Sequence, residues 1–110
     1  MDFLMEQMFN EQESRWDVTL SGEIDVFNSP ELKAKLAELL EERDADLYLH
    51  CARLDYIDST ALGVLVGIMK IIKNNNRAMR LLAVKPSLMK LFRITNLDKV
   101  FEIEGGIAHD

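Results

Sequence analysis

Residues 46–73, DLYLHCARLDYIDSTALGVLVGIMKIIK, predict a buried strand followed closely by a long apolar helix. The strand is expected over residues 46–51, where Leu47, Leu49 and Cys51 alternate with other side chains at the two-residue period of a half-buried strand. From about Ser59 to Lys73 the apolar residues recur at helical spacing instead, and three asparagines end the run. Such a strand–helix unit favours an α/β fold.

The segments before this unit predict a hairpin and a first helix. Strands are expected over residues 3–10 and 15–21, although the first of these segments could also begin a helix. Gly22 is expected to end the second strand and to leave residues 23–28 as a loop. Ser29 is then the predicted N-cap of a helix with Pro30 at its first position, and leucines form its buried stripe (Leu32, Leu36, Leu39 and Leu40).

The C-terminal third continues the alternation of strands and helices. A strand is predicted over residues 79–84, a third helix opens at Pro86, a short strand covers 99–104, and residues 105–110 are expected to be a frayed tail. The pattern predicts one domain spanning residues 1–110, with a core over about 3–104. Its architecture is α/β, with a small mixed sheet of about five strands and three to four helices.

The composition excludes several classes of function. The chain has 110 residues, with 13 Lys and Arg against 19 Asp and Glu, so its net charge of -6 argues against binding nucleic acid or anionic lipid. One cysteine excludes an intrachain disulfide, and His50 and His109 lack zinc-ligand spacing. The longest apolar run is too short to span a bilayer, and the acidic start lacks the features of a signal peptide. We therefore expect a cytoplasmic protein without a cofactor.

Three consecutive polar residues, Asp58, Ser59 and Thr60, precede the apolar helix. A hydroxyl in the first turn of a helix is exposed, and the free amides there tolerate an attached anion. The simplest interpretation is that Ser59 or Thr60 merely caps the helix.

The helix behind these residues is apolar nearly all round. One stripe is sufficient to cover a sheet, whereas a second stripe is either a partly exposed partner surface or is buried against a neighbouring helix (Ala61, Val64, Ile68 and Ile71). Gly63 and Gly67 share one face, where tight packing of helix on sheet is a commoner explanation than a docking groove.

An enzymatic function is disfavoured by the same residues. A serine nucleophile needs a base, and His50 is expected to be a strand-end or solvent histidine. Asp25, Asp55 and Asp58 could gather a divalent metal in principle, but their spacing matches no calcium or phosphate-binding motif. Cys51 is expected to be a small buried residue.

Five segments carry a resemblance to a known family. The segments LSGEID (residues 20–25) and SPEL (29–32) resemble the start of a STAS domain, and YIDSTALGVL (56–65) is similar to the signature of bacterial anti-sigma-factor antagonists. KPSLMKLF (85–92) and LDKVF (97–101) are similar to the family's last helix and strand, so the resemblance covers about residues 15–103. Ala61 stands where the family usually has Gly, and because Ala favours helix by roughly 1 kcal/mol, a stiffer first turn is expected.

The resemblance implies a regulatory cycle. The unmodified protein would bind an anti-sigma factor with serine kinase activity and release the sigma factor, phosphorylation of Ser59 would reverse the binding, and a serine phosphatase would reset it. The partner surface implied by the resemblance lies around the start of the helix (Asp25, Asp58, Thr60, Ala61, Gly63 and Val64).

Two other functions remain open from the sequence. One is a STAS scaffold or transporter-associated subunit that acts by protein contact without a phosphate cycle. The other is a nucleotide or small-anion binder at the helix start, although a glycine-rich phosphate loop is missing. The protein is expected to be a monomer or a weak homodimer formed through the outer apolar stripe of the second helix.

Overall fold

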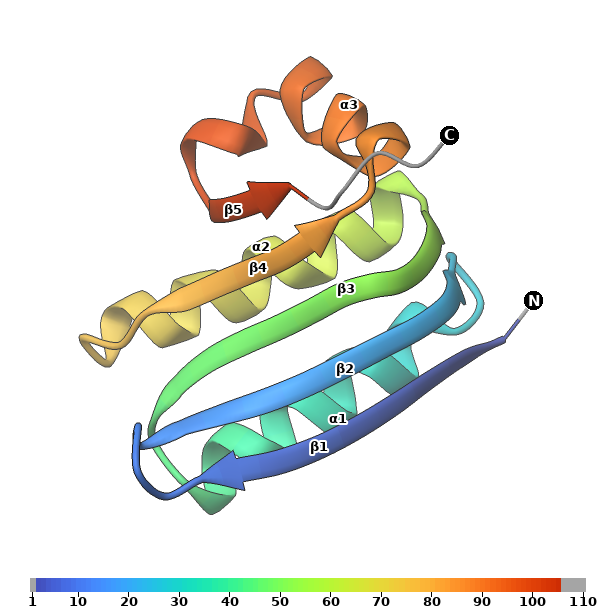
Figure 1. Ribbon diagram of the computed structural model, residues 1–110. Helices are drawn as coiled ribbons and strands as arrows, with labels where there is room; N and C mark the ends of the chain where they lie inside the picture. Colours follow the sequence, from blue (N-terminus) through green and yellow to red (C-terminus); the bar gives the residue numbers. More distant parts are fainter. Residues whose placement is uncertain (1, 106–110) are drawn as a thin grey trace.

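The structure is a computed structural model that describes residues 2–105, and it confirms the predicted α/β class (Figure 1). A five-stranded mixed sheet has the order β1-β2-β3-β4-β5, in which β1 is antiparallel to β2 and the remaining neighbours are parallel. In chain order the elements are β1 (Phe3–Asn10), β2 (Arg15–Ile24), α1 (Ser29–Glu42), β3 (Asp46–Ile57), α2 (Ser59–Asn74), β4 (Met79–Val84), α3 (Pro86–Ile94), a 3₁₀ turn (Leu97–Lys99) and β5 (Glu102–Gly105).

Helices α1 and α2 lie side by side behind the sheet and leave its other face open (Figure 1). Because side chains alternate along a strand, one set from β2, β3 and β4 points at the helices and forms the core. Val18, Leu49 and Leu81 are each at most 1% exposed. Within residues 2–105, no helix combines the length and the apolar character needed to cross a bilayer.

Two strands are longer than the sequence pattern predicts. Strand β2 continues through Gly22 to Ile24 because this glycine adopts φ +92°, a conformation that side chains with a Cβ rarely take. A Cβ at Gly22 would also lie 2.4 Å from the carbonyl oxygen of Asp2. Strand β3 continues to Ile57, and its second half is anchored by the buried side chains of Leu54 and Ile57. The predicted loop over residues 23–28 therefore shrinks to residues 25–28.

Three predicted boundaries were wrong. Asn28, not Ser29, occupies the N-cap position of α1, and Ser29 is the first helical residue and is 1% exposed. The strand expected over 99–104 begins at Glu102, because the preceding residues form the 3₁₀ turn. Gly105 belongs to this strand and not to a frayed tail, and residues 106–110 lie outside the described residues.

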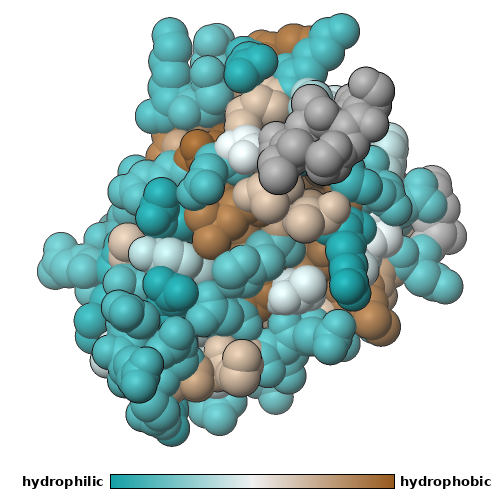
Figure 2. Space-filling model, viewed as in Figure 1, coloured by the Kyte–Doolittle hydropathy of each residue, from teal (hydrophilic) through white to brown (hydrophobic). Residues whose placement is uncertain are grey.

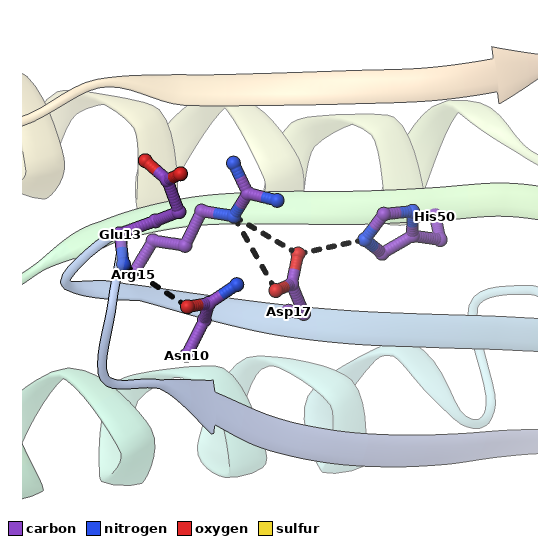
Figure 3. A network of polar contacts seen from close by, with 5 residues as sticks. All are labelled: Asn10, Glu13, Arg15, Asp17 and His50. Atoms are coloured by element: carbon purple, nitrogen blue, oxygen red, sulfur yellow. Dashed lines mark hydrogen bonds and ion pairs between the residues drawn. The ribbon is translucent and has the colours of Figure 1, made fainter.

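A polar network occupies the open face of the sheet (Figure 3). His50 lies within β3, not at a strand end, and its Nε2 is 2.8 Å from Oδ1 of Asp17 on β2. Arg15 also contacts the Asp17 carboxylate, at 3.3 Å. Burial raises the pKa of Asp17, but the hydrogen bonds and charges of His50 and Arg15 outweigh it and leave this pKa below its usual value.

Because of this network, the free energy of unfolding should decrease as the pH falls in the acid range. Because the folded-state pKa of Asp17 is lowered, its ionised form stabilises the fold above the unfolded pKa of about 4, and this stabilisation is lost as the pH falls through the folded value. We expect Asp17→Asn to be less stable than wild type at pH 7 and to approach it at pH 3. Urea unfolding at both pH values measures the two differences, and a gap that does not change with pH would contradict this role.

Candidate functional site

The site is built around Asp58, which joins the end of β3 to the start of α2. Its Oδ1 accepts a hydrogen bond from the amide of Ala61 at 2.9 Å, and this bond caps the helix. Its Oδ2 accepts a second hydrogen bond from the amide of Val26 at 2.8 Å, in the loop after β2. The carboxylate therefore holds the helix start and this loop together, and the interpretation of Ser59 or Thr60 as the cap is wrong.

Ser59 is the first residue of α2 and is exposed. Within residues 2–105 its hydroxyl has no hydrogen-bond partner, so it is free to react or to contact another molecule. The first amides of a helix have no partner within the helix and carry about half a positive charge together. An anion attached to Ser59 would therefore be tolerated by the fold itself.

The loop at residues 25–28 is held rigidly beside the helix start. Oδ1 of Asp25 accepts hydrogen bonds from the amides of Phe27 and Asn28, at 2.9 and 3.1 Å. Oδ1 of Asn28 in turn accepts one from the Asp25 amide at 2.8 Å, and its side-chain nitrogen donates to the Glu23 carbonyl at 2.9 Å. The Asp25 side chain therefore makes its hydrogen bonds within the loop, and the residue is only 7% exposed.

This rigid loop presents two apolar side chains outward. Val26 is 49% exposed and Phe27 is 89% exposed. The sequence reasoning missed both residues and treated the segment only as a loop. The available signal was two adjacent apolar residues in a short segment flanked by Asp25 and Asn28. Large exposed apolar side chains that a rigid loop holds in place are typical of a protein contact.

A shallow hollow adjoins Ser59 on the side of α3. Its apolar wall includes Leu88 and Leu91 of α3, and Tyr56 of β3 is 43% exposed beside them. The ion pair between Lys85 and Asp55 connects α3 to the end of β3, next to this hollow. The exposed serine thus lies between an apolar loop and an apolar hollow.

The predicted partner residues differ in how far they are exposed to solvent. Asp58 and Thr60 lie at the surface beside Ser59, and Gly63 is exposed one turn further along α2. Val64 is half-buried, whereas Ala61 is fully buried. The Ala61 methyl group therefore points into the core and cannot meet a partner, and Asp25 can contribute to a contact only by shaping its loop.

The outer side of α2 also differs from the predicted packing. Ala61 and Ile68 are buried in the core, so only Ile71 of the outer stripe is substantially exposed, at 44%. Gly63 and Gly67 do not pack on the sheet, because a Cβ at either position would meet nothing within 4 Å. They leave a flat strip along α2 that starts at Thr60.

Within residues 2–105, the structure brings no histidine near Ser59 to act as the base of a serine hydrolase. His50 is paired with Asp17 and lies about 20 Å before Ser59 along the extended β3. Among the described residues, no group of three His, Cys, Asp or Glu side chains could hold a metal ion. Cys51 is buried as predicted, and this burial raises the pKa of its thiol to about 12.

Comparison with known proteins identifies the family of this chain and agrees with its fold. The model of the STAS domain matches residues 8–108, so the chain belongs to the STAS domain family. It is 38% identical over 101 residues to the anti-sigma-B factor antagonist of Bacillus subtilis, with 88% of this chain and 92% of that protein covered. The protein of the same name from Staphylococcus aureus is 32% identical over 95 residues, with 86% and 88% covered. Within the STAS domains, the chain therefore belongs with the anti-sigma factor antagonists.

A solved structure shares the fold. The anti-sigma factor antagonist from Mycobacterium paratuberculosis superposes with a TM-score of 0.82 at 18% identity, covering 94% of this chain and 86% of that one.

Proposed function

We propose that this protein is a phosphorylation-controlled binding module that antagonises an anti-sigma factor. In the unmodified state it binds an anti-sigma factor with serine kinase activity, and the sigma factor is released. Phosphorylation of Ser59 ends the binding, and a serine phosphatase restores it. One observation carries the proposal. The hydroxyl of Ser59 is exposed and does not cap the helix, and it lies between the apolar loop at Val26–Phe27 and the hollow beside α3.

The geometry gives a physical reason for the switch. A phosphate adds about -1.5 to -2 charges, which the amino terminus of α2 partly compensates within this protein. At a contact that excludes water, the same charge would lie beside Asp58 and against the exposed apolar side chains of Val26 and Phe27. Like-charge repulsion and the cost of desolvating a dianion can then amount to several kcal/mol. The partner is expelled without any change of fold.

The protein acts by binding and not by catalysis in this proposal, and it works in the cytoplasm, where a kinase has access to ATP. The flat strip at Gly63 and Gly67 supports this role, because a partner can approach the backbone of α2 closely there.

Incubating the purified protein with a cognate anti-sigma kinase and ATP tests whether Ser59 accepts the phosphate. Mass spectrometry should find one phosphate on Ser59, and Ser59→Ala should abolish its incorporation. Thr60→Ala is the matched control, because it removes the neighbouring exposed hydroxyl and should leave phosphorylation intact. A phosphate on Thr60 would overturn the assignment of Ser59 as the acceptor. A partner that binds the protein but leaves it unphosphorylated in the presence of ATP would contradict the cycle and favour a scaffold role.

A further inference from the structure

The two edges of the sheet differ in how well they are protected. Strand β5 has four residues, and its two glutamates are exposed, which are features that prevent pairing with another strand. Strand β1, at the other edge, has eight residues without proline and only one charged side chain, that of Glu6 (Figure 1). Leu4 and Met8, on either side of Glu6, are 60% and 69% exposed. This edge is open to pairing with another strand.

The hydrogen-bonding groups of β1 can be assigned to its two sides. The amide of Glu23 donates to the carbonyl of Asp2 at 3.0 Å, and this pair continues the register in which Phe3 faces Gly22. Because hydrogen-bonded pairs alternate along an antiparallel ladder, the even-numbered residues of β1 bond to β2. The main-chain groups of the odd-numbered residues therefore face the free edge (Phe3, Met5, Gln7 and Phe9).

We propose that this edge is a homodimer interface, in which β1 of one copy pairs antiparallel with β1 of a second copy around a two-fold axis at Glu6. Centring the axis there makes Phe3 face Phe9 of the second copy, and Met5 face Gln7. Every outward amide and carbonyl of β1 then has a partner. On the open face of the sheet, Leu4 packs against Met8 of the second copy on both sides of the axis.

The charges of α1 favour a second copy as the occupant. Lys35 lies over the ring of Phe3, with its Nζ 6.0 Å from the ring centroid, whereas Arg43 near the other end of α1 lies over the ring of Phe9. Glu42 precedes Arg43 and lines the hollow between β1 and α1 together with Lys35. Since the two-fold axis places Phe3 opposite Phe9, it brings Lys35 of each copy toward Glu42 and Arg43 of the other. The charge of Arg43 is already paired with Glu11 at 3.0 Å, so Glu42 remains to attract Lys35.

Two contacts between like charges oppose the pairing and make it weak. Glu6 faces its own copy across the axis, and like charges directly opposite each other are destabilising. Glu38 of α1 lies beside Met5 and Gln7, next to the axis, so it also faces its own copy. We therefore expect a dimer that forms at high concentration and that Glu6→Gln tightens by about two- to fivefold. The sequence predicted dimerisation through the outer stripe of α2, but most of that stripe is buried. The edge of β1 takes its place as the proposed dimer interface. It shares no residue with the Ser59 site, so its test is independent of the proposed function.

Cysteine cross-linking tests the register directly. A non-hydrogen-bonded pair places its Cα atoms about 4.5 Å apart, within the range of a disulfide. Under mild oxidation, Glu6→Cys should form a covalent dimer. Leu4→Cys is the matched control on the same strand and face, and it should not link to itself, because its two copies lie about 14 Å apart along the strands. A mixture of Leu4→Cys and Met8→Cys should give the mixed dimer. The native Cys51 is buried and does not compete.

Sedimentation velocity across a concentration series provides the second measurement. Gln7→Pro removes an outward amide without removing a bond to β2, and it should abolish dimerisation. Lys35→Glu should weaken it, and adding Glu42→Lys should restore it. The proposal is overturned if Glu6→Cys cross-links no better than Leu4→Cys, if Glu6→Gln remains monomeric at all concentrations, or if Gln7→Pro dimerises like wild type.

Discussion

Ser59→Asp is expected to weaken binding to the anti-sigma factor by at least about tenfold while leaving the protein folded, since each 1.4 kcal/mol lost corresponds to a factor of ten. The substitution places a negative charge at the exposed start of α2, next to Asp58 and the apolar loop. Within the folded protein, the helix amino terminus compensates this charge. Isothermal titration calorimetry measures the affinity, and differential scanning calorimetry measures the thermal midpoint.

Ser59→Asn separates charge from size in this experiment. Asparagine has nearly the shape of aspartate but no charge, so it should retain most of the affinity that Ser59→Asp loses. Equal losses for both variants would show that steric crowding, and not electrostatics, controls the contact. A strongly lowered thermal midpoint for Ser59→Asp would show that the charge acts through unfolding.

Asp58→Ala is expected to have the largest effect on the stability of the site. It removes the cap of α2 and leaves the amide of Val26 without its acceptor, at an expected cost of about 1–3 kcal/mol. For a domain of this size, each kcal/mol lowers the thermal midpoint by about 4–8 °C. Because the loop at Val26–Phe27 is also released, binding should weaken together with stability. Thermal unfolding and calorimetric titration of the same preparation measure both effects.

Asp55→Ala is the matched control for this variant. Asp55 is an exposed carboxylate near the end of the same strand, and its ion pair with Lys85 is at the surface. Such pairs contribute at most about 1 kcal/mol, so the thermal midpoint should change little. A loss of stability as large as that of Asp58→Ala would show that Asp58 has no special role in joining α2 to the loop.

Periodicity was sufficient to predict the order and type of the main elements. Leu47 and Leu49 alternate in sequence and lie in the core, and the helix predicted from Ser59 begins at that residue. Boundaries failed where tertiary contacts override local signals. Gly22 was predicted to end β2, yet its positive φ allows the strand to continue beside Asp2.

The functional residues were predicted only in part, for a physical reason. A tripeptide of Asp58, Ser59 and Thr60 offers three potential caps, and the choice depends on which side chain also reaches the loop at Val26. That contact joins residues 32 positions apart, so no local pattern indicates it. The burial of Ala61 likewise depends on how α2 packs in the folded core, and the outward position of Phe27 depends on the hydrogen bonds within its loop.

The most direct test of the phosphorylation switch uses protein that carries a phosphate on Ser59 alone. Its affinity for the anti-sigma factor and its thermal midpoint should be measured beside those of the unmodified protein in the same buffer. We expect affinity to fall by at least about a hundredfold, which corresponds to about 2.8 kcal/mol, with the thermal midpoint changed by no more than a few degrees. Binding as tight as that of the unmodified protein, or a loss of binding that merely follows unfolding, would contradict an electrostatic switch at this serine.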